Sequence, residues 1–312
     1  MVRQSLLLNK TMKEQILNKI REISGSERVL VNEPMSKHTT FKVGGPADIF
    51  ISIKDTKEAI EIIRLLCDFN IPYFVIGNGS NLLVKDEGYR GVIIELGKHF
   101  SSINIAEDTI TADAGALLSK VANEAYKASL SGLEFASGIP GSVGGGVFMN
   151  AGAYGGEMKD VVESVTLLNT KTGQIVVKSC SEMEFAYRYS IAKKESFIIL
   201  SAKFKLSPSN RDSIKEKMDN LKALRVEKQP LEYPSAGSTF KRPEGYFAGK
   251  LIQDAGLKGY TVGGAMVSDK HSGFVINKGN ATASDIMTLI SDVQRIVYEK
   301  FEVRLETEVC ML

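Results

Sequence analysis

The sequence predicts an α/β protein with more than one domain. Its 312 residues exceed what one hydrophobic core usually holds, so we expect two or three domains. Residues 48–53, 56–69 and 72–76 have the pattern of a strand, a helix and a second strand, which predicts a βαβ unit. Glycine-rich stretches follow at 77–82 and 137–156, and the first stands directly after a strand, where α/β folds place phosphates.

Helices and strands alternate in the first third of the chain. Apolar residues spaced by four, four and three from Met12 to Ile23 predict an amphipathic helical arm. The helix over 56–69 has one continuous apolar face. Strands are expected over residues 29–33, 48–53, 72–76 and 91–96.

In the middle third, strands stand on both sides of the longer glycine-rich stretch. A helix is predicted over 117–128, and another begins at 181–184. The polar sequence SPSNR at 207–211 predicts a domain boundary. The strands are expected over residues 103–105, 109–112, 161–168, 174–178 and 196–206.

The last third combines helices with two strands. Ser284 is the expected N-cap of its longest helix, and Gly256 ends a shorter one. By alternation alone, Glu308 lies on the solvent-facing edge of the final strand. The helices are expected over residues 214–225, 245–255 and 284–301, and the strands over 273–277 and 303–309.

The composition excludes several classes of protein. The chain is 43% hydrophobic and 24% charged, its net charge is +2, and no basic stripe indicates a nucleic-acid partner. No apolar run approaches the roughly 20 residues that span a bilayer, and the leucine patch near the N-terminus is too short for a secretory signal. Cys67, Cys180 and Cys310 are too scattered for a disulfide framework or a metal site. We therefore expect a cytoplasmic protein without a structural metal.

The stretch from Ser137 to Gly156 predicts a ligand-binding loop. It holds eight of the 28 glycines and no charged residue, which favours a buried loop over a surface linker. Glycine permits positive φ and leaves no Cβ between a ligand and the backbone. Successive N–H groups can then bind a phosphate-bearing cofactor without a lysine. A tight turn between strands is the alternative.

The sequence GNGSNL at 77–82 predicts a second phosphate loop. Its spacing is not G-x-G-x-x-G, because Leu82 stands at the last position, and no Walker lysine follows. An ordinary Asn-Gly turn remains the alternative.

Arg188 and Ser238 can each be interpreted either as a functional residue or as an ordinary surface or turn residue. Arg188, between two tyrosines, is either a surface residue or a clamp for a carboxylate, to which guanidinium donates two parallel hydrogen bonds. Ser238 lacks the G-x-S-x-G elbow of a hydrolase, so it is either a turn residue or a proton donor.

Six motifs together resemble the UDP-N-acetylenolpyruvoylglucosamine reductase family. In chain order they are GNGSNLLV, SGLEFASGIPGSVGGGVFMNAGAYGGEM, YRYS, PSAGSTFKRP, AGKLIQDAGLKG and VRLETEV. The resemblance implies a fold of the vanillyl-alcohol-oxidase type, with non-covalent FAD held by two subdomains and a third α+β domain for substrate. The implied parts are an N-terminal helical arm at 1–38, FAD-binding subdomains at 39–96 and 97–208, and a substrate-binding domain at 209–312.

The resemblance also implies a set of cofactor-binding residues, all of them in the two glycine-rich loops. They are Gly77, Asn78, Gly79, Ser80, Asn81, Leu82, Ser137, Gly138, Ile139, Pro140, Gly141, Ser142, Gly145, Asn150, Gly152 and Ala153.

The reaction that the resemblance implies is the NADPH-dependent reduction of UDP-N-acetylglucosamine enolpyruvate to UDP-N-acetylmuramate, in peptidoglycan precursor synthesis. Hydride passes from NADPH through flavin N5 to C3 of the enolpyruvyl group. Arg188 and Glu308 match the pair that steadies the enolate, and the Glu308 pKa is expected to be raised. Ser238 matches the proton donor to C2. The implied substrate-binding residues are Tyr187, Lys228, Lys250 and Gln253.

Some features depart from the family pattern, and other functions remain open. One subtype of the family has an inserted loop with a tyrosine after the YRYS motif, and its absence here indicates the shorter subtype. In the motif FKRP, Arg242 stands where the family often has an asparagine. We expect a monomer. An FAD-dependent oxidase or dehydrogenase of the same fold is the alternative, and reoxidation by air without the UDP-sugar would favour it. A colourless purified protein would instead favour a non-enzymatic binding protein.

Overall fold

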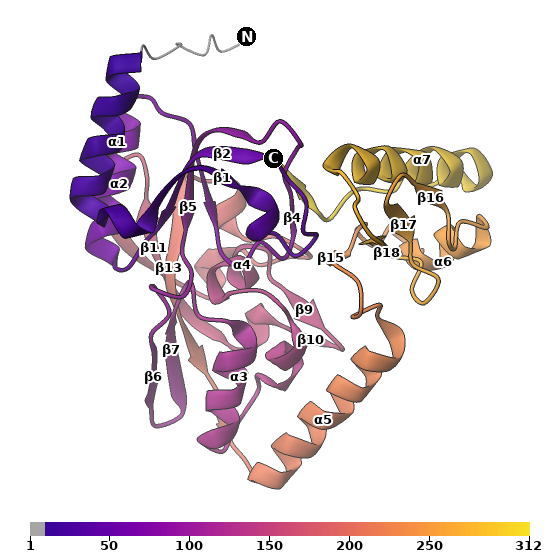
Figure 1. Cartoon of the computed structure of the whole chain (residues 1–312). Coiled ribbons are helices and arrows are strands. Elements are labelled where there is room, and N and C mark those ends of the chain that lie inside the picture. Colours follow the sequence, from indigo (N-terminus) through magenta and orange to yellow (C-terminus); the bar gives the residue numbers. More distant parts are fainter. Residues whose placement is uncertain (1–9) are drawn as a thin grey trace.

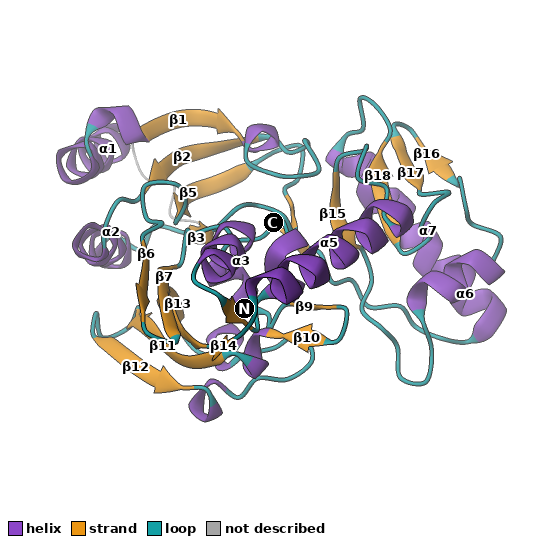
Figure 2. Ribbon diagram, turned by 90° about the horizontal axis from the view of Figure 1, so that it is seen from below, coloured by secondary structure: helices purple, strands orange, loops and turns teal. Residues whose placement is uncertain are grey.

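The described part of the chain contains three larger β-sheets, each formed by a different stretch of the sequence (Figure 1). The computed structural model describes residues 10–312. The first two sheets form one half of the molecule, with one continuous apolar core, and the third sheet lies to one side with a core of its own (Figures 1 and 2).

The first sheet confirms the predicted βαβ unit and places another strand inside it. In spatial order its strands are β1 (Val29–Pro34), β2 (Pro46–Ser52), β5 (Tyr89–Glu95) and β3 (Tyr73–Ile76). β2, β5 and β3 run parallel, and β1 is antiparallel to β2.

Two helices lie side by side against the first sheet (Figure 1). They are α1 (Lys10–Ser24) and α2 (Thr56–Asp68). Ile16 and Ile20 of α1 are buried, which confirms the predicted amphipathic helix. The side chain of Met12, which belongs to the same predicted face, lies outside the described residues.

The second sheet is antiparallel throughout, and its five strands match the sequence prediction to within one residue. In spatial order they are β12 (Ile175–Ser179), β11 (Val162–Asn169), β13 (Phe197–Lys205), β7 (Thr109–Asp113) and β6 (Ile103–Ala106). The predicted helix α3 (Leu118–Lys127) and the short helix α4 (Val143–Phe148) pack against this sheet.

The last third of the described chain holds the third sheet and three helices, and the last of these helices packs on the sheet. Its strands are β15 (Ser235–Ser238), β18 (Phe274–Asn277), β17 (Ala265–Val267) and β16 (Thr261–Val262). The helices are α5 (Arg211–Lys228), which extends from beside α3 to this sheet (Figures 1 and 2), α6 (Ala248–Asp254) and α7 (Ala283–Phe301).

The third sheet is packed onto the rest of the molecule through its core. Phe41, Val43 and Leu83, all from the first third of the chain, are buried in the same apolar cluster as α7. The end of the chain returns from the third sheet to the other half of the molecule, where β19 (Cys310–Met311) pairs in parallel with β4 (Leu82–Leu83). The two halves are therefore joined by both packing and strand pairing.

Short elements complete the described chain. The remaining strand pairs are β8 (Leu130–Ser131) with β14 (Ser207–Pro208), and β9 (Gly152–Ala153) with β10 (Gly156–Glu157). The 3₁₀ turns are η1 (Ser26–Arg28), η2 (Met35–Lys37), η3 (Glu134–Gly138), η4 (Met158–Asp160), η5 (Ser181–Met183) and η6 (Ile191–Lys193).

The prediction of a regular final strand over 303–309 is wrong. This segment has a single strand-like bridge, between Phe240 and Thr307, and the paired strand begins only at Cys310. The solvent-facing position expected for Glu308 by alternation is also wrong, because its side chain is only 12% exposed. The position of this side chain is decided by its contact with Arg188, which is distant in the sequence, and not by the alternation of polar and apolar residues.

Two local predictions about helix starts are corrected as well. The N-cap of α7 is Thr282, whose Oγ1 accepts from the Asp285 N–H at 3.0 Å, and Ser284 lies inside the first turn. The expected helix at 181–184 is a single 3₁₀ turn. In contrast, α4 forms where a loop was expected, and the Ser142 hydroxyl caps it by accepting from the Gly145 N–H at 3.4 Å.

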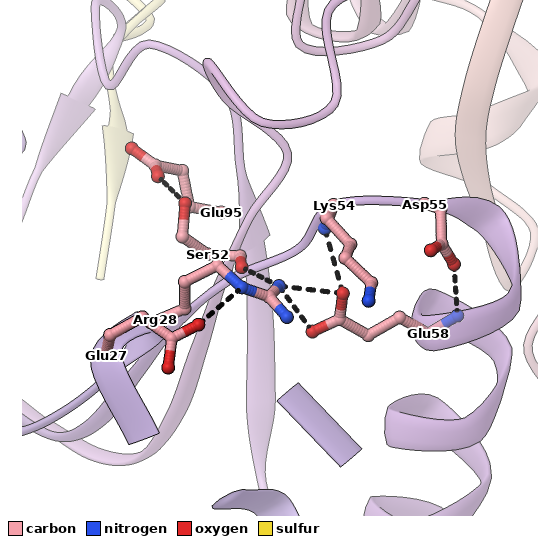
Figure 3. A network of polar contacts seen from close by, with 7 residues as sticks. All are labelled: Glu27, Arg28, Ser52, Lys54, Asp55, Glu58 and Glu95. Carbon is pink, nitrogen blue, oxygen red and sulfur yellow. Dashed lines mark hydrogen bonds and ion pairs between the residues drawn. The ribbon is translucent and has the colours of Figure 1, made fainter. Parts of the chain in front are cut away.

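A buried ion pair fastens the N-terminal region to the first sheet and α2 (Figure 3). Arg28 Nη1 lies 2.7 Å from a carboxylate oxygen of Glu58 and donates to the Ser52 carbonyl at 2.8 Å. The Glu58 side chain is 3% exposed, so loss of Arg28 would leave an uncompensated buried charge. Nearby, the Ser52 hydroxyl donates to Glu95 at 2.5 Å.

Within residues 10–312, no helix has the length and apolarity needed to cross a membrane. The same part of the chain contains no cluster of three His, Cys, Asp or Glu side chains that could hold a metal ion.

Candidate active site

The first glycine loop stands at the carboxyl end of β3 and is shaped by close backbone approaches. An added Cβ at Gly77 would overlap the Ser142 hydroxyl, and one at Gly79 would overlap the His38 carbonyl. Gly79 also has φ +58°, a left-handed conformation that glycine adopts without steric cost. These positions therefore require glycine in this structure.

The two glycine loops lie against each other and expose backbone donors. The Asn78 side-chain amide donates to the Pro140 carbonyl at 2.5 Å. Within the described part of the chain, the backbone N–H groups from Gly77 to Ser80 donate to no protein acceptor. Unpaired N–H groups at the end of a parallel strand form a site for an anion.

A cavity of about 500 Å³ opens beside this cradle. Gly77, Asn78, Gly115 and Leu117 line it, together with basic side chains and the Ser52–Glu95 pair seen in Figure 3. The basic residues on its walls are Arg28, His38, Lys98, His99 and Lys120. The glycine cradle and the free N–H groups fit a dinucleotide cofactor with a pyrophosphate group, and Lys98 and Lys120 add positive charge, since Arg28 is paired with Glu58.

The second glycine loop is partly open, whereas the sequence predicted it to be buried. Gly138, Pro140 and Gly145 are exposed, while Ser142 and Asn150 are almost fully buried. The exposed positions face outward where a ligand can approach the backbone. The prediction of burial is therefore correct for about a third of the stretch, namely Ser142, Val143, Gly146, Val147, Asn150 and Ala151.

Besides Asn78, the other two asparagines predicted to bind the cofactor also have side chains bonded to protein. The Asn150 amide donates to Glu157 and to the Ala186 carbonyl, and its Oδ1 accepts from the Lys159 N–H. The Asn81 amide donates to the Glu308 carbonyl at 3.1 Å. Both side chains connect the glycine loops to the segments that carry Arg188 and Glu308.

A second cavity, of about 540 Å³, brings the three predicted catalytic residues together. Arg188, Ser238 and Glu308 all line it. Three of the four predicted substrate-binding residues line it too, and these are Tyr187, Lys250 and Gln253. Lys228, the fourth, is exposed at the end of α5 and is not among the lining residues.

Arg188 and Glu308 form a largely buried ion pair. Arg188 Nε donates to Glu308 Oε1 at 2.8 Å, and their side chains are 21% and 12% exposed. Burial raises the pKa of the Glu308 carboxyl above its ordinary value, although Arg188, Lys193 and Lys241 act in the opposite direction. The direction of this shift confirms the expectation from the sequence.

Arg188 sits in a strained turn. Ala186 and Tyr189 exchange two backbone hydrogen bonds of 3.1 Å around the pair Tyr187–Arg188, and Arg188 has φ +54°. A left-handed conformation costs a residue other than glycine about 1–2 kcal/mol. Strain of this kind persists where the surroundings hold it, and it is concentrated at functional sites.

Several residues of the second cavity were not predicted from the sequence. His271 lines it, accepts from the Gly273 N–H at Nδ1, and has its pKa lowered by burial. The Arg242 guanidinium stacks on Phe247 at 3.8 Å, and Tyr187 Oη accepts from the Arg242 N–H at 2.9 Å. Nothing in the local sequence pattern distinguishes His271, because its position depends on the pairing of β15 with β18.

Two known family models match most of the chain between them. Residues 47–179 match the model of an FAD binding domain. Residues 229–312 match the model described as UDP-N-acetylenolpyruvoylglucosamine reductase, C-terminal domain. The fold and the site therefore define the chain as an FAD-dependent oxidoreductase.

Whole-length relatives identify the family. A UDP-N-acetylenolpyruvoylglucosamine reductase from Agathobacter rectalis is 52% identical over 98% of this chain and 99% of its own length. One from Caldanaerobacter subterraneus is 51% identical, over 96% and 98% respectively. The crystal structure of the reductase from Thermus caldophilus superposes with a TM-score of 0.78 at 36% identity, covering 91% of this chain and 97% of that one. The chain belongs to the UDP-N-acetylenolpyruvoylglucosamine reductase family.

Proposed function

We propose that this enzyme reduces UDP-N-acetylglucosamine enolpyruvate to UDP-N-acetylmuramate, a step of peptidoglycan precursor synthesis, with the chemistry in the second cavity. The observation that carries the assignment of the site is the convergence of Arg188, Ser238 and Glu308 on that cavity. FAD is the cofactor and NADPH the reductant. When bound, the flavin supplies hydride transfer from NADPH to C3 of the enolpyruvyl group.

The cofactor is held by the two glycine loops. The N–H groups from Gly77 to Ser80, and that of Gly141 in the second loop, donate to no protein acceptor in the described chain and would bind the pyrophosphate. We propose that residues 39–96 and 97–208, with Arg28 and His38 of the N-terminal segment, form this cofactor site, and that residues 209–312, with Tyr187 and Arg188, bind the UDP-sugar.

Arg188 and Glu308 stabilise the negative charge that develops when hydride reaches C3. This charge spreads over C2 and the substrate carboxylate, and a guanidinium fixed beside it lowers the barrier without reorganisation. A glutamate helps beside a carboxylate only when it carries or shares a proton. The raised pKa of Glu308 supports that role.

Ser238 delivers the proton to C2. Its hydroxyl lies on the edge strand β15, and its neighbour Gly237 leaves open space, with nothing within 4 Å of an added Cβ. A hydroxyl is a weak acid, so the developing alkoxide needs cationic neighbours. Arg188 lines the same cavity as Ser238 and is the cation proposed for this role.

We further propose that the enzyme acts in the cytoplasm as a monomer. One described chain contributes both cavities, so no second copy is needed to complete the site. Sedimentation at the mass of one chain would agree with this, and sedimentation at twice that mass would contradict it.

An anaerobic titration tests the proposed function. NADPH is added to the FAD-loaded protein, and UDP-N-acetylglucosamine enolpyruvate follows. The flavin absorbance should bleach with NADPH and return only with the UDP-sugar. Return in air alone at the same rate would point to an oxidase, and no bleaching would remove NADPH as the donor.

A further inference from the structure

The strained turn at Arg188 is held by a lysine that the proposed chemistry does not use. Lys193 lies five residues further along, in η6, and its Nζ donates to the Arg188 carbonyl at 2.7 Å. The segment after the turn therefore folds back on it. A charge-assisted hydrogen bond of this length is roughly twice as strong as one between neutral groups.

The lysine is itself held between the turn and α4. Its Nζ lies 5.6 Å from the centre of the Phe148 ring, within the range of a cation–π contact. The Phe148 carbonyl accepts from the Ser190 hydroxyl at 2.7 Å, and Ser190 is fully buried. The second glycine loop thus supports both the residue that follows the turn and the lysine that caps it.

We propose that Lys193 is a positioning residue for the reduction, which holds the left-handed turn at Arg188 so that the guanidinium points at Glu308. This proposal rests on the proposed function. Without the ammonium, the Arg188 carbonyl loses its donor and the strained conformation loses a contact that offsets its cost. The expected defect is a misplaced guanidinium, not a lost fold.

Replacement of Lys193 by Met tests the proposal, because Met keeps the apolar stem and removes the donor. We expect reoxidation of the reduced flavin by the UDP-sugar to slow by about tenfold or more, which corresponds to about 1.4 kcal/mol of barrier. Reduction by NADPH should stay within about twofold of the wild type. Lys193→Arg, which keeps a charged donor, should recover most of the rate. Lys194→Met, at the exposed neighbouring lysine, is the matched control and should change neither half-reaction.

A pH profile separates positioning from general damage. Arg188, Lys193 and Lys241 are the cations that face Glu308, and all three lower its pKa against the effect of burial. In the pH profile of the substrate half-reaction, we expect a limb in which the rate falls as Glu308 loses its proton. Loss of the Lys193 charge should therefore move this limb to higher pH. The limb should stay in place in Lys194→Met.

Three results would overturn the proposal. They are a Lys193→Met protein that matches Lys194→Met in both half-reactions, an equal slowing of both half-reactions, and no recovery in Lys193→Arg. Failure of the proposed function itself is visible earlier, because the wild-type flavin would then not be reoxidised by the UDP-sugar at all.

Discussion

Arg188 and Glu308 stand 120 residues apart in the sequence and meet at 2.8 Å. Each brings an energetic cost, because Arg188 has a left-handed backbone and Glu308 has a largely buried carboxyl. A pair of this kind contributes little net stability, and breaking it by removing one partner is strongly destabilising. The arrangement is therefore explained by chemistry at the cavity better than by stability.

Glu308 should give the substrate half-reaction a pH dependence. Burial raises its pKa, so the carboxyl keeps its proton to a higher pH than an exposed glutamate does. The rate should be high below this raised pKa and should fall as the pH rises through it. Glu308→Gln should remove that limb while it keeps part of the rate, because the amide stays neutral.

Single-turnover reoxidation across a pH series measures this effect. Glu299→Gln is the control, since the Glu299 side chain is 58% exposed and pairs with Arg295 on the surface, away from the cations that act on Glu308. A Glu308→Gln protein that keeps the wild-type limb would show that another group titrates.

At the scale of elements, the sequence predicts regular structure well and long-range contacts badly. The helices and most strands agree with their apolar periodicity, since burial of one face decides them locally. The segment 303–309 alternates like a strand, but its backbone is held by Phe240 and Thr239 and forms no ladder. α4 contains three glycines, so propensity opposes it, and only the Ser142 cap and packing on β13 make it helical.

The first glycine loop predicts a specific loss of cofactor affinity. Gly79→Ala would place a Cβ against the His38 carbonyl, so the loop has to move and its N–H groups lose their alignment. We expect FAD binding to weaken by about 100-fold, which corresponds to roughly 2.7 kcal/mol. Quenching of FAD fluorescence measures the affinity directly.

Gly173→Ala is a matched control for backbone strain. Gly173 has φ +70°, close to the +58° of Gly79, but an added Cβ there would meet nothing nearer than 3.7 Å. It should cost stability and leave FAD affinity unchanged. Equal effects of the two substitutions on affinity would contradict the steric argument.

At the scale of the whole molecule, the half that contains the first two sheets is joined to the third sheet by strand pairing and side-chain contacts. β19 pairs with β4 beside the first glycine loop, and Asn81 holds the Glu308 carbonyl. The sequence motifs predicted the two loops and the three residues that the second cavity brings together, but not this connection. It depends on the return of the chain end across the molecule, which no local pattern encodes.

Because the two halves are joined in this way, we expect one cooperative unfolding transition, and FAD should move the whole transition to higher temperature. Free FAD at 100 times its Kd should add about 2.7 kcal/mol to the free energy of unfolding. Calorimetry with and without FAD measures the shift. Two transitions, of which FAD moves only the first, would show that the third sheet unfolds independently.

The most direct test of the central claim is stopped-flow measurement of both half-reactions in Ser238→Ala. Ser272→Ala, which changes a second serine lining the same cavity, is the control. Reduction by NADPH should be nearly unchanged in both variants, while reoxidation by the UDP-sugar should slow by roughly 100-fold or more only in Ser238→Ala. Equal loss in both half-reactions, or equal loss in both variants, would contradict the assignment of the second cavity as the place where the substrate is reduced.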